Sequence, residues 1–94
     1  MRIVYSPQAT EDLEAYVKYV ARSNPDAAAR LAQRVLKVVD QLAHGAFEGP
    51  ECRLRSGERA RSWPVHPLRI YYRREADTLS VLRIYHQARR PIVT

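Results

Sequence analysis

The chain has 94 residues and a formal net charge of +6 at pH 7, which fits one compact domain with a modest hydrophobic core. Its single cysteine, Cys52, excludes an internal disulfide and any multi-cysteine metal site. The opening residues lack the long apolar run of a signal peptide, and no window approaches the roughly 18 apolar residues of a membrane span. We therefore expect one domain over residues 1–94, located in the cytoplasm and without membrane contact.

The basic charge is confined to the second half of the chain. Residues 1–50 carry six basic and six acidic side chains, whereas residues 51–94 carry ten arginines and four acidic side chains. All ten cations of the second half are arginine, whose planar guanidinium suits bidentate contact with phosphate or carboxylate. This asymmetry predicts an anionic partner for the second half.

The first half of the sequence predicts a strand followed by a helical hairpin. Residues 2–6 alternate and are rich in β-branched side chains. Ser6 and Asn24 each stand before a proline, which is the pattern of a helix N-cap followed by its first helical residue. One apolar stripe follows each start, with Gly45 ending the second helix. The stripes comprise Ala9, Leu13, Tyr16, Val17 and Val20, then Ala28, Leu31, Ala32, Val35, Val39 and Leu42.

Beyond residue 51 the apolar period changes to two, which predicts strands. The expected strands span residues 52–56, 59–65, 68–74 and 79–86. The order of elements predicts an α+β fold: an N-terminal strand, an antiparallel helical hairpin, then a three- to four-stranded antiparallel sheet with both helices on one face.

Alternation along the last two strands predicts an outer sheet face rich in arginine and tyrosine. In the strand 68–74 one face carries Arg69, Tyr71 and Arg73; in the strand 79–86 the corresponding face carries Val81, Arg83 and Tyr85, with Leu82, Ile84 and His86 opposite. Such a face is either an ordinary solvated sheet surface or a docking surface for an anionic partner.

Few residues of this sequence suit acid–base chemistry. His86 is the one histidine in a charged C-terminal setting and is the candidate for proton transfer near neutral pH, although a packed histidine fits the pattern too. His44 and His66 fall in predicted turns, and Trp63 is expected in the core. The sequence has no Gly-rich phosphate loop, zinc spacing or paired-carboxylate motif, so we expect no cofactor and no metal.

Three stretches together resemble the RelE/ParE toxin superfamily of type II toxin–antitoxin systems. The stretch "VYSPQATEDLEAYVKYVARSNPDAAARLAQRV" is similar to the family's opening strand, helix start, Asp-Leu pair and Asn-Pro junction. The stretches "RSWPV", "LRIYYRR" and "VLRIYHQARRP" are similar to its arginine-bearing strands. The resemblance implies a RelE/ParE-like sheet packed on a helical hairpin and an acidic antitoxin that wraps the toxin.

The resemblance implies one of two activities. ParE-like members bind and poison DNA gyrase, and RelE-like members cut mRNA on the ribosome without a metal. The only lysines, Lys18 and Lys37, lie on the predicted helices, and the tail after His86 has no tyrosine, lysine or histidine. A nuclease would therefore depend on Arg61, Arg69, Arg83 and His86.

The long hairpin and the His-Gln-Ala-Arg ending favour the ParE-like branch, with no catalytic residues and with gyrase as the target. The ribosome-dependent ribonuclease, acting on mRNA, is the alternative. On the ParE-like interpretation the partner-binding residues are Arg61, Arg69, Tyr71, Arg73, Arg83, Tyr85, Arg89 and Arg90.

Overall fold

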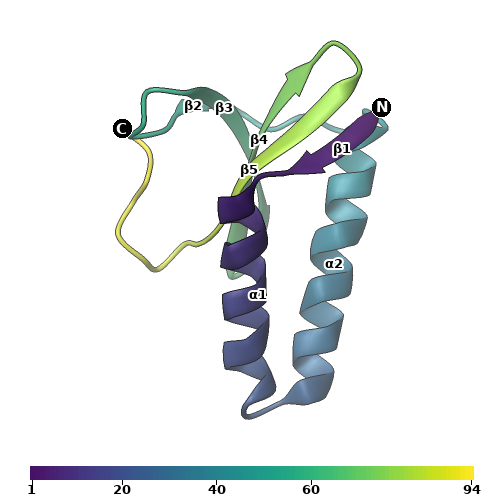
Figure 1. Cartoon of the computed structure of the whole chain (residues 1–94), viewed down its shortest axis with the longest axis vertical. Coiled ribbons are helices and arrows are strands. Elements are labelled where there is room, and N and C mark those ends of the chain that lie inside the picture. The colour runs from purple at the N-terminus through teal and green to yellow at the C-terminus, as the bar shows by residue number, and fades with distance from the viewer.

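The computed structural model describes residues 1–94 as a helical hairpin packed on a twisted sheet (Figure 1). The elements, in chain order, are β1 (Arg2–Tyr5), α1 (Pro7–Ala21), α2 (Pro25–Ala43), β2 (Glu51–Arg53), β3 (Arg59–Val65), β4 (Leu68–Glu75) and β5 (Thr78–His86). The strand order is β1-β5-β4-β3-β2. Strands β2 to β5 are antiparallel to their neighbours, and β1 adds parallel to β5. The predicted α+β fold is confirmed.

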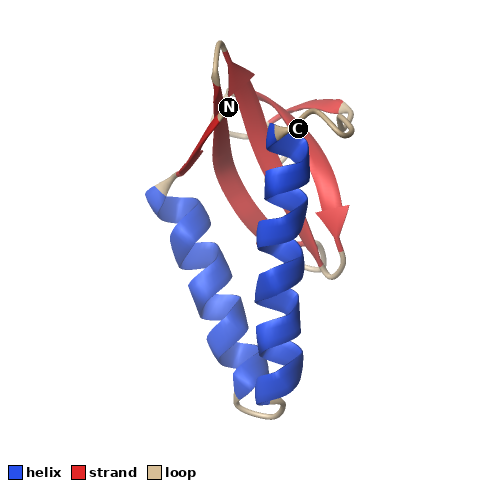
Figure 2. Cartoon of the chain, turned by 90° about the vertical axis from the view of Figure 1, so that its right-hand side faces the viewer, coloured by secondary structure: helices blue, strands red, loops and turns tan.

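Both helices begin at the N-caps that the sequence predicts. Ser6 Oγ accepts a hydrogen bond from the backbone N–H of Ala9 at 3.0 Å, and Asn24 Oδ1 accepts one from Ala27 at 3.0 Å. The Ser6 hydroxyl also donates to the carbonyl of Leu82 at 2.7 Å, so the first cap ties α1 to β5. Figure 2 shows both helices against the same face of the sheet, as predicted.

The main core lies between the hairpin and the sheet. Its buried side chains come from α1, α2, β3, β4 and β5 and include Leu31, Val35, Val39, Leu42, Leu68, Ile70, Tyr72, Leu79, Val81 and Ile84. Trp63 packs at its margin, where its ring stacks on Phe47 with centroids 4.2 Å apart. These apolar positions are the helix stripes and one face of the strands, so burial follows the predicted periods.

Strand β5 contains a β-bulge that changes which residues share a face. Tyr71 pairs with Arg83 and Tyr72 pairs with Val81, so Leu82 is an extra residue on β5. Val81 and Ile84 consequently both lie in the main core, and Leu82 packs on the opposite side of the sheet. The predicted grouping of Leu82 with Ile84 and of Val81 with Arg83 is wrong, because the bulge interrupts strict alternation.

The outer face of the sheet carries a second, smaller apolar cluster. Leu54, Ala60 and Tyr71 are buried there, and Cys52, Leu82, Tyr85, Ile92 and Val93 pack around them. Residues 87–94, which we call the C-terminal arm, return across this face from the end of β5 to β2, as the yellow segment of Figure 1 shows. The predicted open face of arginine and tyrosine is therefore wrong in part, because the arm covers its apolar centre.

Candidate binding surface

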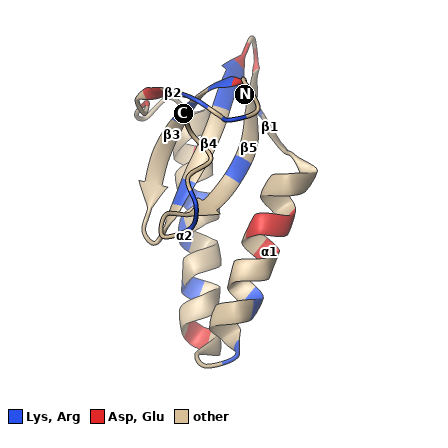
Figure 3. Cartoon of the chain, turned by 90° about the vertical axis from the view of Figure 1, so that its left-hand side faces the viewer, with Lys and Arg blue, Asp and Glu red and all other residues tan.

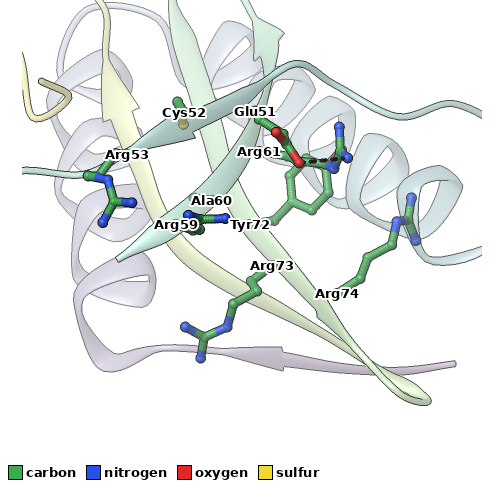
Figure 4. A pocket seen from close by; sticks show the side chains of 9 residues that line it. All are labelled: Glu51, Cys52, Arg53, Arg59, Ala60, Arg61, Tyr72, Arg73 and Arg74. Atoms are coloured by element: carbon green, nitrogen blue, oxygen red, sulfur yellow. Dashed lines mark hydrogen bonds and ion pairs between the residues drawn. The ribbon is translucent and has the colours of Figure 1, made fainter. Parts of the chain in front are cut away.

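Arginine is most concentrated where β3 and β4 separate. The two strands pair from Val65↔Leu68 to Arg61↔Tyr72, and beyond this point they diverge. The divergence leaves a groove of about 460 Å³. Figure 4 shows its lining, which includes five arginines: Arg53, Arg59, Arg61, Arg73 and Arg74.

Arg61 and Arg74 are held by glutamates at one side of the groove. Arg61 donates to the carbonyl of Gly49 at 2.8 Å and to Glu51 Oε1 at 3.3 Å. Arg74 Nε donates to Glu48 Oε1 at 3.0 Å. These ion pairs fix the two guanidinium groups against the 47–51 loop, and they leave little uncompensated charge there.

The uncompensated charge of the groove lies at Arg53 and Arg59, which stand directly opposite each other on β2 and β3. No carboxylate pairs with either residue, and Arg53 donates only to the carbonyl of Gly57 at 2.9 Å. Arg73 is bound to Glu58 at 3.1 Å. Like charges directly opposite on paired strands repel, so this pair of arginines is an attractive place for an anion.

Two of the predicted partner-binding residues belong to the outer face and its small cluster. Arg69 Nη1 donates to Ser62 Oγ at 2.7 Å. Tyr71 is only 8% exposed, and burial raises its pKa above the ordinary value. Burial also raises the pKa of the nearby Cys52 thiol. Tyr71 thus contributes to packing under the arm, while Arg69 is anchored beside it.

Arg83 lies on the outer face opposite Tyr71, and its guanidinium is bound to helix α1. Its Nε and Nη2 donate to the two oxygens of Asp12 at 2.7 and 2.9 Å, and the backbone N–H of Ile84 donates to the same carboxylate at 3.1 Å. The side chains of Asp12 and Arg83 are 11% and 29% exposed. Hydrogen bonding to Asp12 raises the pKa of Arg83. Asp12 thereby caps the edge of β5 at the point where β1 no longer pairs with it.

His86 lies at the other end of this edge, against α1. Its ring contacts Tyr16 with centroids 5.0 Å apart, and its Nδ1 accepts the backbone N–H of Ala88 at 3.0 Å. The four residues on which a nuclease would depend each have a different partner. The partners are Glu51 for Arg61, Ser62 for Arg69, Asp12 for Arg83 and the Tyr16 ring for His86.

The remaining predicted residues lie on or near the arm. Arg89 and Arg90 are exposed, and the Tyr85 hydroxyl donates to the carbonyl of Arg90 at 2.8 Å. The guanidinium of Arg83 lies 5.1 Å from the centroid of the Tyr85 ring. Arg89 and Arg90 are thus free to meet a partner, whereas Tyr85 positions the arm.

Sequence reasoning missed a second groove, of about 700 Å³, between α1 and the end of β5. Tyr16, Tyr19, Leu68, Ile84 and His86 are among its lining residues. Tyr19 is 65% exposed, and its ring lies 5.9 Å from that of Tyr16. The sequence signal for this groove was the pair Tyr16 and Tyr19, three positions apart on a predicted helix and therefore neighbours on its surface. Apolar periodicity alone assigns Tyr16 to the core.

Figure 3 shows basic residues along the strands and on both helices, with acidic residues on the first half of α1 and at the tip of the β4–β5 hairpin. No group of three or more His, Cys, Asp or Glu side chains is arranged to hold a metal ion. Neither helix is long and apolar enough to cross a membrane.

We expect the free energy of unfolding to fall as the pH rises above 10. Burial, and then the charge of Asp40, raises the pKa of Tyr5 above its ordinary value of 10.0, and burial raises that of Tyr71. The unfolded chain therefore loses these protons first, so stability present below pH 10 is lost at higher pH. Urea midpoints between pH 8 and 11 measure the loss. Tyr5→Phe/Tyr71→Phe should flatten the curve, and Tyr19→Phe should not; an unchanged slope in the double variant would contradict the assignment.

The helical hairpin on one face of the sheet, together with the arginine groove, defines a small basic α+β protein of the RelE/ParE-like fold. Residues 3–91 match the sequence profile of the family described as the ParE toxin of the type II toxin-antitoxin system, parDE. The chain therefore belongs to the ParE toxin family of type II toxin–antitoxin systems.

A solved structure supports the fold independently. The chain is similar to a chain of the chromosomal ParDE toxin–antitoxin system from P. aeruginosa, with a TM-score of 0.74 and 19% sequence identity. The similarity covers 92% of this chain and 95% of that chain. No curated protein sequence matches the chain.

Proposed function

We propose that the chain is a toxin that binds and poisons DNA gyrase and that an acidic antitoxin neutralises it. Membership of the ParE toxin family carries the proposal. The excess of arginine over acidic residues in residues 51–94 supports an acidic partner, because arginine pairs strongly with carboxylates.

The surroundings of the candidate nuclease residues support a binding protein over a ribonuclease. Metal-independent cleavage requires a proton-transfer group and cations that converge on one phosphate. Here His86 contacts Tyr16 beside α1, whereas Arg61 is bound to Glu51 at the groove and Arg83 to Asp12. Arg83 holds the fold together through this pair, so it is not free to bind a partner.

The gyrase-binding surface proposed here is the arginine groove together with the exposed part of the arm. Arg53 and Arg59 join the predicted set because neither has a carboxylate partner. Arg61 and Arg73 line the same groove with their guanidinium groups already anchored, and Arg69 is anchored to Ser62 on the outer face. Arg89 and Arg90 extend the surface, whereas Tyr71 and Tyr85 support it from below.

Purified protein should inhibit DNA supercoiling by gyrase and trap a gyrase–DNA cleavage complex. Arg53→Gln/Arg59→Gln should raise the inhibitory concentration by about tenfold, because loss of about 1.4 kcal/mol of binding free energy changes affinity tenfold. The matched control is Arg22→Gln/Arg30→Gln, which removes two exposed arginines from the hairpin and should leave inhibition unchanged. Folding of each variant is checked by its urea midpoint.

Two outcomes would overturn the proposal. The first is the absence of both inhibition and a trapped cleavage complex at stoichiometric toxin. The second is cutting of mRNA in translating ribosomes that disappears in His86→Ala, which would assign the RelE-like activity in place of gyrase binding.

A further inference from the structure

The tip of the β2–β3 hairpin carries three exposed arginines. Strand β3 pairs with β4 only from Arg61 to Val65, so residues 53–59 extend beyond the pairing with β4. Arg53, Arg55 and Arg59 are exposed there. No carboxylate forms an ion pair with any of the three. Uncompensated cations gathered in so short a segment raise the local positive potential and attract an anion.

The acidic side chains near this tip are already engaged by other arginines. Glu58 accepts a hydrogen bond from Arg73 Nη1 at 3.1 Å, and Glu51 accepts one from Arg61 Nη2 at 3.3 Å. Both glutamates are therefore compensated by arginines of β3 and β4. An incoming anion can bind the three arginines of the tip without breaking an ion pair that they form.

Two of the three arginines can reach one anion together. Arg53 and Arg59 stand opposite each other, and the N–H of Leu54 donates to the carbonyl of Glu58 at 2.9 Å in the next pair along the hairpin. Arg53 and Arg59 are thus a non-hydrogen-bonded pair, in which the Cα atoms are about 4.5 Å apart and the side chains leave the same face. A phosphodiester has two unesterified oxygens, and each can accept from a different guanidinium. A carboxylate, in contrast, is matched by the fork of a single arginine.

The tip lacks the side chains that anchor a protein partner or stack on bases. Residues 55–59 are all exposed, and none of them is apolar or aromatic. Tyr72, the aromatic residue of the adjoining groove, is fully buried. Protein interfaces depend on aromatic and apolar anchors, and single-stranded nucleic acid binds through bases stacked on exposed rings. A nucleic acid duplex requires neither, because its phosphates lie on the outside.

We propose that the tip of the β2–β3 hairpin is a contact site for the phosphate backbone of duplex DNA, with Arg53, Arg55 and Arg59 bonded to phosphates. The contact has no sequence preference, because phosphates are alike at every base pair. The choice of DNA over duplex RNA rests on the proposed function, whereas the phosphate site rests on the three free arginines. Within a gyrase–DNA complex these arginines meet the DNA, and the rest of the gyrase-binding surface meets the enzyme.

Direct binding to a short, fluorescently labelled DNA duplex tests the site. The purified chain should raise the anisotropy of the duplex, and the logarithm of the affinity should fall linearly with the logarithm of the salt concentration. Arg53→Gln/Arg59→Gln should weaken binding at least about tenfold at about 0.1 M salt. It should also lower the magnitude of the salt slope by about 2, since each lost phosphate contact removes about 0.9.

Matched variants and ligands complete the experiment. Arg55→Gln alone should lower the magnitude of the salt slope by about 1. Arg22→Gln/Arg30→Gln removes the same net charge as the double variant of the tip, but from the helical hairpin, and should change neither affinity nor slope. Two duplexes of unrelated sequence should bind equally. Urea midpoints establish that each variant is folded.

Several results would contradict the DNA site. They are the absence of duplex binding at low salt, an unchanged slope in both variants of the tip, and an equal loss of affinity in the two double variants. Tighter binding of a single strand or of duplex RNA would contradict the choice of duplex DNA. Displacement of the duplex by polyglutamate at equal charge concentration would make the tip a carboxylate site.

The DNA site and the gyrase target fail separately. If Arg53→Gln/Arg59→Gln weakens gyrase inhibition but leaves DNA affinity unchanged, these arginines meet the enzyme and the DNA site is wrong. If the chain binds DNA through them but does not inhibit gyrase, the DNA site stands and the gyrase target is wrong.

Discussion

Replacing Asp12 by alanine should lower the free energy of unfolding by about 3 kcal/mol. The substitution removes the partner of a largely buried guanidinium, since the Arg83 side chain is 29% exposed and that of Asp12 is 11% exposed. It also removes the acceptor of the Ile84 N–H at the edge of β5. Urea unfolding measures the change. For a domain whose whole stability is on the order of 5–15 kcal/mol, this loss is large.

Matched variants separate the two interactions of the Asp12 carboxylate, its ion pair with Arg83 and its hydrogen bond from the Ile84 N–H. Asp12→Asn keeps an oxygen that can accept from Ile84 but loses the charge facing Arg83. Glu11→Ala removes the neighbouring exposed carboxylate, for which no ion pair is seen, and should change stability by less than about 0.5 kcal/mol. A cycle of Asp12→Ala, Arg83→Ala and the double variant gives the coupling energy. A coupling below about 1 kcal/mol would reduce this ion pair to an ordinary surface salt bridge.

Gly49→Ala should destabilise the fold by about 3 kcal/mol through overpacking. A Cβ at Gly49 would lie 1.8 Å from the carbonyl oxygen of Ser62 and 2.7 Å from its carbon, so the loop or strand β3 must move. The same glycine donates to the Tyr72 hydroxyl at 2.8 Å and accepts from Arg61 at 2.8 Å. Displacement of the loop would therefore also release one wall of the arginine groove.

Gly45→Ala is the control that separates crowding from backbone strain. A Cβ at Gly45 meets nothing within 4 Å, but its φ of +74° is unfavourable for alanine. We expect a cost of about 1 kcal/mol there. Tyr72→Phe, which leaves the N–H of Gly49 without its partner, should cost about 1–3 kcal/mol. If Gly49→Ala is no worse than Gly45→Ala, the close approach to Ser62 does not constrain the loop.

The sequence was most informative where structure depends on neighbouring residues. Ser6-Pro7 and Asn24-Pro25 define both helix starts, because an N-cap and its following proline act within one turn. The strand over residues 59–65 was predicted with its bounds correct, since alternation is a local pattern. The resemblance to the RelE/ParE superfamily was likewise confirmed by the family match.

Prediction failed where one extra residue changes a whole face. Leu82 is the extra residue of a β-bulge in the β4–β5 pairing, and no residue type in "LSVLRIYH" indicates a bulge there. The bulge moves Val81 into the main core and Leu82 to the outer face, whereas Arg83 and Tyr85 still lie opposite Tyr71 and Arg69 as predicted. The ion pair between Asp12 and Arg83 joins residues 71 positions apart, so it depends on how α1 packs on β5.

The sequence by itself determined the α+β class, the two helix starts, the main core and the basic character of the second half, because caps, periodicity and charge are properties of short segments. Only the tertiary structure decided which arginines are free. Arg83 is bound to Asp12, Arg61 to Glu51 at the start of β2 and Arg74 to Glu48 in the loop before it, whereas Arg53 and Arg59 have no carboxylate partner. The physical reason is that an ion pair depends on distance in space, and the chain brings these partners together only when it folds.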